Sequence, residues 1–314
     1  MINAAIVGLG RWGKNLVNSV QGNSGKLRFI HCVVRRPETA REFAGQQSLE
    51  LSTDFDRMLR DDRIQAVVLA TPHSLHTQQI VAAAAAGKAV FCEKPLALNK
   101  ADAERAVQAC RSAGVTLGLG HDKRFWGSMQ ELRRVAASGE LGQLLHLEGH
   151  FSNESTRRYY EGWRAADKDA PGGGLTATGI HILDAFVAVA GPVRSVHAHL
   201  VSHPPAPEPV DTLSVVLEFS SKVSGVLCGV RTTPQYWRVH VFGKEGSVEA
   251  IGPTDLTLRK TDVQPTHLTF EPVDSLRLEL EAFADAVAGG TPYPITPEQM
   301  IDGVAALEAT IRSM

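Results

Sequence analysis

Glycines at a fixed spacing near the start of the chain are suited to holding a phosphate group. The stretch follows the apolar run Ala4–Val7, precedes an amphipathic segment, and reads Gly8-Leu9-Gly10-Arg11-Trp12-Gly13. Glycines at the GxGxxG spacing make a tight turn and let the backbone approach a pyrophosphate, which then lies at the N-terminus of the next helix. Because the pattern stands between a predicted strand and a predicted helix, we expect this turn to bind a dinucleotide.

A lysine follows what reads as a buried strand. The apolar run Ala89–Cys92 is typical of a strand in a parallel sheet, and Glu93, Lys94 and Pro95 come directly after it. In open α/β sheets ligands bind at the carboxyl ends of the strands, so we expect Lys94 to point into the ligand crevice. Pro95 stiffens the turn and allows a cis peptide bond. An isolated Glu-Lys-Pro is also compatible with solvated loop charges.

A histidine lies about two turns into a helix that a glycine-rich loop precedes. Gly172, Gly173 and Gly174 come before the expected helix Leu175–Ala190, which contains His181. Histidine exchanges protons near neutral pH, which suits acid–base chemistry on a hydroxyl group, although a lone histidine here can equally be a core residue. Its neighbours on the same helix face are expected three and four positions away, at Ala177, Thr178, Asp184 and Ala185.

The end of the second expected strand bears on the choice of cofactor. Arg35 and Arg36 follow the strand Leu27–Val34, and no acidic residue stands at its tip. An acid at this place normally binds the ribose hydroxyls of NAD, whereas guanidinium groups suit a 2′-phosphate. The sequence therefore favours NADP(H), and Gly13 keeps NAD(H) open. The two arginines could instead be solvated loop charges.

Strands and helices alternate over the first 120 residues. The expected elements are Ala4–Val7, Leu27–Val34, Pro37–Ala44, a helix that Thr53 or Asp54 caps and that runs to Arg60, Ile64–Ala70, an alanine-rich helix ending at Gly87, Ala89–Cys92, Lys100–Ala113 and Val115–Leu119. This alternation predicts an α/β Rossmann domain with a doubly wound parallel sheet at residues 1–120. Thr71 and Pro72 follow one strand, and His76 could contact the cofactor or cap the next helix.

The pattern changes after residue 120. The expected elements are a helix at Trp126–Ser138, a strand at Leu144–Phe151, the helix Leu175–Ala190, several strands from Val193 to Phe270 with breaks at Pro204–Pro209, Ser220–Ser224 and Gly243–Gly246, and helices at Leu276–Ala288 and Pro297–Arg312. They predict an α+β domain at residues 121–314 with an open, mainly antiparallel sheet that binds substrate and mediates self-association. The loop from Asn153 to Pro171 is expected to shape the substrate pocket.

Composition excludes several classes of partner. The net charge is −2, which argues against nucleic acid or an anionic membrane as a partner. Four scattered cysteines show neither metal-ligand spacing nor a disulfide pattern, so we expect no metal and a reducing cytoplasm. The expected first strand begins almost at Met1, which leaves no room for a signal peptide, and the most apolar window is too short to span a bilayer.

Taken together, these motifs resemble the Gfo/Idh/MocA oxidoreductases, the family of glucose–fructose oxidoreductase and inositol dehydrogenase. The matching residues are Gly8-Leu9-Gly10-Arg11-Trp12-Gly13, Ala70-Thr71-Pro72 with His76, Gly87-Lys88, Glu93-Lys94-Pro95-Leu96, Arg124-Phe125, Trp163-Arg164, and Gly172-Gly173-Gly174 with His181 and Asp184. They span nearly the whole chain in family order. The resemblance implies a Rossmann domain followed by an open-faced sheet domain, hydride transfer between a nicotinamide and a carbinol carbon of a sugar, polyol or cyclic diol, and a homodimer or homotetramer.

The resemblance also implies roles for individual residues. Lys94 would bind the reacting oxygen and His181 would relay the proton, with Thr178 as a further catalytic candidate that can donate a hydrogen bond. Cofactor binding would fall to Gly8, Gly10, Arg11, Trp12, Gly13, Arg35, Arg36, Thr71, Pro72, His76, Glu93 and Lys94, and substrate binding to Arg124, Trp163, Arg164 and Asp184. The family usually has an aspartate one turn before the histidine, where this chain has Ala177.

Two other functions use the same scaffold. One is redox-assisted glycoside cleavage with a tightly held cofactor. The other is a non-catalytic protein that senses a dinucleotide and regulates a partner. Lys94 and His181 argue against the second, whereas the absence of an acid at position 177 argues mildly for it.

Overall fold

The chain folds into two compact units. A computed structural model describes residues 1–153, 169, 171–172, 174–203, 210–231 and 233–314. The first unit comprises Met1–Asp122 and Asp274–Met300, and the second comprises Lys123–Val273 and Ile301–Met314. The chain therefore passes between the units three times, and the segment Asp274–Met300, which the sequence placed after the first domain, packs with it.

A six-stranded parallel sheet forms the first unit, in the order β3-β2-β1-β4-β5-β6. This is the strand order of a dinucleotide-binding Rossmann fold, as the sequence predicted. The elements of the unit are β1 (Ile2–Val7), α1 (Arg11–Val20), β2 (Leu27–Val33), η1 (Pro37–Thr39), α2 (Arg41–Gln46), β3 (Glu50–Ser52), α3 (Phe55–Leu59), β4 (Ala66–Leu69), η2 (His73–Leu75), α4 (His76–Ala85), β5 (Ala89–Glu93), α5 (Lys100–Ala113), β6 (Leu117–Gly120) and α8 (Ser275–Val287).

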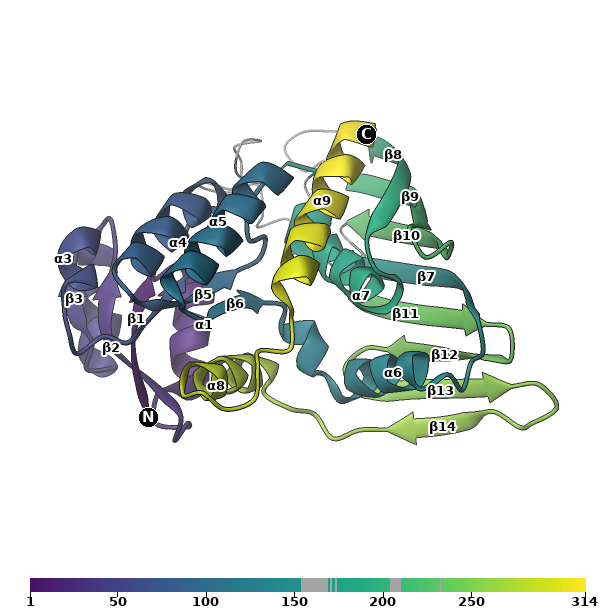
Figure 1. The fold of residues 1–314 in the computed structure, drawn as a ribbon, viewed down its shortest axis with the longest axis horizontal. Coiled ribbons are helices and arrows are strands. Elements are labelled where there is room, and N and C mark those ends of the chain that lie inside the picture. Colours follow the sequence, from purple (N-terminus) through teal and green to yellow (C-terminus); the bar gives the residue numbers. More distant parts are fainter. Residues whose placement is uncertain (154–168, 170, 173, 204–209, 232) are drawn as a thin grey trace. The chain divides into compact units, whose positions relative to one another are not determined.

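Local sequence explains where the helices of this unit begin and end. The Asp54 carboxylate accepts a hydrogen bond from the backbone N–H of Arg57 and so caps α3, and Asn99 caps α5 in the same way through Asp102. Gly114 ends α5 with a φ of +67°, in the left-handed region. Helices α4 and α5 then lie side by side (Figure 1).

Helix α8 completes the core of the first unit although it follows β6 by more than 150 residues. It packs against α1 and against β2, β5 and β6. The rings of Phe283 and Phe91 meet edge to face with centroids 5.6 Å apart. A Cβ added at Gly118 would lie 2.9 Å from each of these two rings, so β6 needs a glycine where α8 approaches.

An eight-stranded sheet forms the second unit, in the order β14-β13-β12-β11-β7-β10-β9-β8. Its described strand pairs are antiparallel except for β7 with β10. Its elements are η3 (Asp122–Phe125) at the unit boundary, α6 (Gly127–Ser138), β7 (Leu144–Asn153), the π-helical turn η6 (Leu175–Gly179), α7 (Ile180–Ala190), β8 (Val193–His203), β9 (Val210–Phe219), β10 (Ser224–Arg231), β11 (Tyr236–Gly243), β12 (Gly246–Ile251), β13 (Asp255–Lys260), β14 (Thr266–Thr269) and α9 (Pro297–Ser313), which begins in the first unit.

Helices cover one face of the second sheet. Helix α6 packs on β12 and β13 while α7 packs on β7 and β10, and both lie on the same face (Figure 1). A Cβ added at Gly149 of β7 would collide with the side chain of Ile182 and lie 2.9 Å from the ring of Phe186. This close approach explains the glycine, and it places the glycine-led helix with His181 directly against the strands.

Candidate active site

The glycine turn after β1 has the geometry that phosphate binding requires. Gly8 has a φ of +95°, and a Cβ there would lie 2.6 Å from the carbonyl oxygen of Ala70. A Cβ at Gly13 would collide with the carbonyl oxygen of Gly8. Beside Gly10, by contrast, the space within 4 Å of an added Cβ holds no atom of the described chain. The turn is thus closed toward β4 and open at the start of α1.

The N-terminus of α1 can accept a phosphate group. Its first-turn N–H groups have no partner within the helix, and at Gly10 no side chain of the described residues caps them. The helix dipole adds a partial positive charge at this end. A pyrophosphate fits both features, so the residues present suit a dinucleotide. Arg11 is exposed and Trp12 is half-buried at the same end.

Arg35 and Arg36, the two arginines predicted to bind a 2′-phosphate, lie on the surface after β2. Both follow the end of β2 and both are exposed, and neither stands in a helix or strand. Glu38, within η1, is exposed as well. The arrangement leaves two guanidinium groups available to an anion, while their contact with a 2′-phosphate stays a prediction.

His76 links the loops that follow β4 and β5. Its Nδ1 lies 2.8 Å from the carbonyl oxygen of Pro95, and its Nε2 lies 3.1 Å from that of Thr71. The side chain is fully buried. Two carbonyl oxygens can only accept, so a neutral ring donates to one of them. This geometry gives His76 a definite structural role, and its contact with a cofactor stays a prediction. Pro72 stands at the N-cap of η2.

Glu93 and Lys94 come together at the tip of β5, and the Lys94–Pro95 peptide bond is cis. Glu93 is 6% exposed and Lys94 is half-buried. Burial raises the pKa of Glu93 to about 7, an effect that Lys94 and Trp12 oppose and Asp122 reinforces. A Cβ on Gly120 would lie 2.8 Å from Oε1 of Glu93, so β6 leaves room for this carboxyl group only because it ends in glycine.

In the second unit, Arg124 and Asp184 are paired with each other. The Nε of Arg124 lies 2.7 Å from Oδ2 of Asp184, and its Nη2 lies 2.7 Å from Oδ1. Their side chains are 3% and 5% exposed. The pair joins η3 to α7, which gives both residues a structural role, and their direct contact with a substrate stays a prediction.

His181 packs against a tryptophan of the second sheet. It is 6% exposed in α7, and its ring centroid is 6.3 Å from that of Trp237. Trp237 in turn meets Trp126 edge to face at 5.6 Å. The sequence predicted one continuous helix here, but the turn before His181 is π-helical, a form often found at functional sites. Ala177 and Thr178 lie in that turn and are half-buried.

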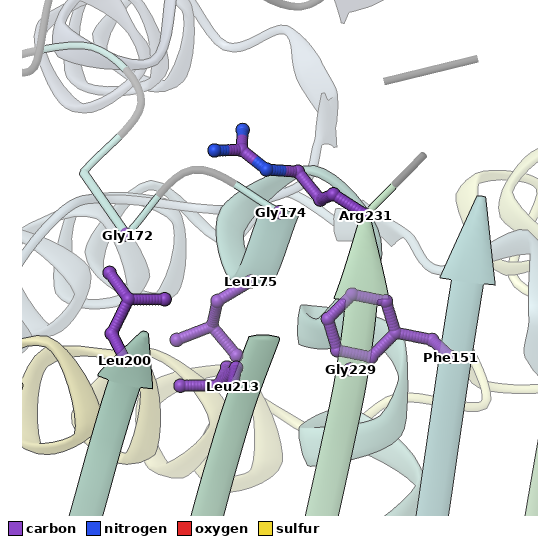
Figure 2. A pocket seen from close by; sticks show the side chains of 8 residues that line it. All are labelled: Phe151, Gly172, Gly174, Leu175, Leu200, Leu213, Gly229 and Arg231. Atoms are coloured by element: carbon purple, nitrogen blue, oxygen red, sulfur yellow. The ribbon is translucent and has the colours of Figure 1, made fainter. Parts of the chain in front are cut away.

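Arg231 is a candidate that the sequence reasoning missed. It ends β10, is 5% exposed, and burial lowers the pKa of its guanidinium to about 10. Figure 2 shows its side chain reaching over the Gly174 end of the glycine-rich segment, beside a pocket that Phe151, Leu175 and Leu213 also line. A Cβ on Gly174 would lie 3.1 Å from Cγ of Arg231. Only the fold brings a strand-end arginine to the glycines, so no sequence motif marks it.

Several predicted site residues lie outside the described part of the chain. Trp163 and Arg164, predicted to bind substrate, are among them, as is Gly173 of the glycine-rich loop. Most of the loop that was expected to shape the pocket, which contains Tyr159 and Tyr160, also lies outside it. Within the described residues, no helix combines the length and the apolar character needed to cross a membrane.

Sequence comparison assigns both units. Residues 2–121 match the Gfo/Idh/MocA oxidoreductase family with its NAD-binding Rossmann fold, and residues 129–249 match the Gfo/Idh/MocA C-terminal domain. The chain belongs to the Gfo/Idh/MocA family. The resemblance inferred from the motifs is thereby confirmed, together with the α/β plus α+β fold class. The Gly8–Gly13 turn lies within the residues that match the Rossmann-fold domain of this family, and its contact with a dinucleotide stays a prediction.

Two curated Gfo/Idh/MocA relatives align over nearly their whole length. The scyllo-inositol 2-dehydrogenase (NAD(+)) of Bacillus subtilis is 30% identical, over 99% of this chain and 92% of that protein. The D-xylose 1-dehydrogenase (NADP(+)) 2 of Haloferax volcanii is 30% identical, over 96% of this chain and 93% of that protein. Other alignments are shorter: the one with an oxidoreductase of Streptococcus pneumoniae is 30% identical over 46% of this chain and 39% of that protein. A solved oxidoreductase structure from Thermotoga maritima shares the fold, with a TM-score of 0.86 and 23% identity over 99% of this chain and 96% of that one.

Proposed function

We propose that this protein is an NAD(P)-dependent dehydrogenase or reductase that transfers a hydride between nicotinamide and a carbinol or carbonyl carbon. One observation carries the proposal: a single parallel sheet delivers both the Gly8–Gly13 turn and Lys94 to its carboxyl edge. Ligands of open α/β sheets bind along that edge. The substrate class is a sugar, a polyol or a cyclic diol, in line with the similarity to an inositol dehydrogenase and a xylose dehydrogenase.

The chain would hold the cofactor at several places. The open N-terminus of α1 binds the pyrophosphate, and the exposed Arg35 and Arg36 bind a 2′-phosphate. NADP(H) is therefore the proposed cofactor, although one of the two relatives is an NAD(+) enzyme and the other an NADP(+) enzyme. When bound, the nicotinamide ring accepts the hydride in oxidation and returns it in reduction.

Lys94 and His181 would share the work on the reacting hydroxyl group. In oxidation the carbinol C–H bond breaks and its electron pair leaves as hydride, while the O–H proton passes to His181 and a carbonyl forms. Lys94 donates a hydrogen bond to the same oxygen and stabilises the negative charge that develops as the proton leaves. Thr178 cannot take a proton at neutral pH, so its proposed role is a hydrogen bond to the substrate.

A substrate panel tests the proposal. Purified protein is mixed with NADP⁺ or NAD⁺ and with polyols, aldoses and cyclic diols, and absorbance at the reduced-nicotinamide band is followed. An increase with a member of the panel, lost in Lys94→Ala, is expected. Cleavage of a glycoside without net cofactor turnover, or binding of the dinucleotide with no turnover of any substrate class, would refute it in favour of the glycosidase or the regulator.

Self-association through the second sheet and a cytoplasmic location belong to the same proposal. The face opposite the helices carries exposed apolar residues on three strands, Val216 at 54%, Tyr236 at 42% and Ile251 at 39%. Covering such a face in a homodimer or homotetramer removes it from water. Light scattering should give a mass above that of one chain, and Val216→Lys should lower it.

A further inference from the structure

A histidine lies in an unfavourable position on β2, next to the edge strand of the first sheet. His31 is on β2 and is 5% exposed, where alternation places it on the same face as Leu27 and Phe29. Neither of its ring nitrogens has a hydrogen-bond partner among the described residues. Buried polar groups are normally paired, so an imidazole here calls for an explanation that packing alone does not supply.

Two carboxylates lie beside this imidazole. Glu50 is its register partner on the edge strand β3, and its Oε2 is 3.9 Å from Nδ1 of His31. Asp61 follows α3, in a turn whose carbonyl oxygens at Asp61 and Ile64 accept hydrogen bonds from Nζ of Lys88. One ligand atom from each of His31, Glu50 and Asp61 lies within 4.8 Å of the other two.

That spacing suits a metal ion. Three atoms no more than 4.8 Å apart share a centre at most about 2.8 Å from each, and Zn–N and Zn–O bonds are about 2.0–2.2 Å long. Side-chain shifts of less than about 1 Å would therefore close the site. We propose that His31, Glu50 and Asp61 bind one divalent transition-metal ion of the Zn²⁺ class, with water completing the coordination.

The protonation states agree with this assignment. Burial lowers the pKa of His31, so the ring is neutral at pH 7. The nearby carboxylates Glu50 and Asp61 raise this pKa, whereas the arginines Arg63 and Arg57 lower it further. Hydrogen bonds from Arg63 lower the pKa of Glu50, and they lower that of Asp61 to about 2. A metal needs its ligands deprotonated, and these three already are. An imidazole with two carboxylates favours zinc-like ions over Ca²⁺ or Mg²⁺, which prefer oxygen ligands alone.

Arg63 is the internal competitor for this site. Its Nη2 lies 2.7 Å from Oε2 of Glu50 and 2.6 Å from Oδ2 of Asp61. Its side chain is 63% exposed and can swing into solvent, whereas His31 cannot. The guanidinium therefore acts as a built-in counter-ion that a metal must displace, which makes the metal affinity of the wild type moderate.

The site is separate from the cofactor turn. Asp61 and Arg63 precede β4, so they lie at the amino edge of the sheet, whereas Gly8 and Thr71 follow β1 and β4 at the carboxyl edge. The sequence predicted no metal, and the proposed site departs from that expectation. Its ligands come from three separate segments, so no spacing in the sequence marks them. Metal at this place would fasten β3 and the end of α3 to β2.

Calorimetric titration of the full-length, tag-free chain with Zn²⁺ tests the proposal, after removal of metals by a chelator. Wild type should bind one equivalent of Zn²⁺. Both His31→Leu and Glu50→Gln should lower the affinity for this ion at least tenfold. His267→Leu, which removes an exposed histidine from the second unit, should keep it. Arg63→Gln should tighten binding several-fold, whereas the exposed Arg28→Gln should not.

Two of these substitutions, Glu50→Gln and Arg63→Gln, make the outcome decisive. Glu50 is 54% exposed, so Glu50→Gln is informative even if His31→Leu fails to fold. Equal zinc binding by wild type and Glu50→Gln, or no binding by either wild type or Arg63→Gln, would overturn the proposal and leave an ordinary ion-pair cluster. Weaker binding in Arg63→Gln would overturn it as well, because the guanidinium would then not compete.

Discussion

Arg124 and Asp184 hold each other through two hydrogen bonds of 2.7 Å each, with both side chains almost fully buried. The planar guanidinium binds the carboxylate in a bidentate manner, so the pair fixes the orientation of α7 relative to η3. His181 lies one helical turn before Asp184 on α7. The position of His181 therefore depends on this ion pair. In the sequence, Arg124 and Asp184 are recognised only as two separate family motif residues.

Breaking this pair should strongly destabilise the second unit. Arg124→Met or Asp184→Leu leaves one charge buried alone, which costs about 3–5 kcal/mol. The double variant should recover most of that loss, because no unpaired charge remains. Denaturant unfolding of the four proteins measures the coupling. Arg134→Met, which breaks exposed pairs with Glu131 and Glu140, is the control and should change the free energy of unfolding far less. Additive losses in the double variant would contradict the pairing.

Lys94→Ala should lower kcat/KM by at least about 10²–10³-fold, since a hydrogen bond to a developing oxyanion is lost. Cofactor affinity, followed by quenching of tryptophan fluorescence, should change little. Lys100→Ala removes an exposed ammonium group from the start of α5 and is the control. Normal turnover in Lys94→Ala would end the catalytic assignment.

Replacing Arg35 and Arg36 by glutamine should weaken NADP(H) about tenfold or more while NAD(H) changes little, because only NADP(H) has the 2′-phosphate. Titration of the two cofactors against wild type and the double variant measures the difference. Arg41→Gln removes an equally exposed charge from α2 and should affect both cofactors alike. Equal losses for both cofactors in the double variant would show that these arginines do not bind the phosphate.

Ala177→Asp should restore the acid that the family usually has one turn before the histidine. A carboxylate in the π-helical turn would add an ionisable group near the proposed proton relay, so the pH dependence of kcat/KM or the order of substrate preference should change. Ala177→Asn, which has the same shape without the charge, separates charge from bulk. Identical pH profiles for the wild type and Ala177→Asp would place residue 177 outside the site.

Glu93 should make the stability of the first unit depend on pH. Burial raises its pKa from 4.5 to about 7, so the folded state holds this proton more tightly than the unfolded state does. The stability that this proton provides is therefore complete below pH 4.5 and is lost as pH rises through 7. Glu93→Gln keeps the shape and removes the titration. The difference in free energy of unfolding between Glu93→Gln and wild type should therefore shift in favour of the variant from pH 5 to pH 8, by at most about 3 kcal/mol.

Denaturant unfolding at these two pH values checks the prediction. Glu42→Gln, at an exposed position of α2, is the control and should show no such gain. A gain for Glu93→Gln that is equal at pH 5 and pH 8 would mean that the carboxyl group does not titrate in this range.

Much of this fold follows from local patterns in the sequence. The apolar runs that became β1, β4 and β5 are continuous, and Asp54, Asn99 and Gly114 mark helix ends through side chains or backbone angles of their own. The strand β3 was missed because its three residues, Glu50–Ser52, carry no alternation long enough to recognise. The two-residue hairpin between β11 and β12, by contrast, was marked by its glycines.

The parts of the site that escaped prediction depend on contacts between distant segments. Arg231 reaches Gly174 across 57 positions of sequence, and His31 meets Asp61 only because β2 and the end of α3 lie together. No spacing rule covers such pairs. Conversely, the motifs predict Arg124 and Asp184 as substrate contacts, whereas in the folded chain they pair with each other.

Because the chain passes between the units three times, the units cannot be separated by cutting the gene at one place. A fragment that stops at residue 121, where the first family match ends, would lack α8 and leave the ring of Phe91 beside Gly118 without its partner Phe283. Grafting the second unit of a relative onto this Rossmann sheet likewise requires three splice points, near Asp122, Val273 and Met300. Shuffling at a single junction would divide a core, and the resulting hybrids should be insoluble.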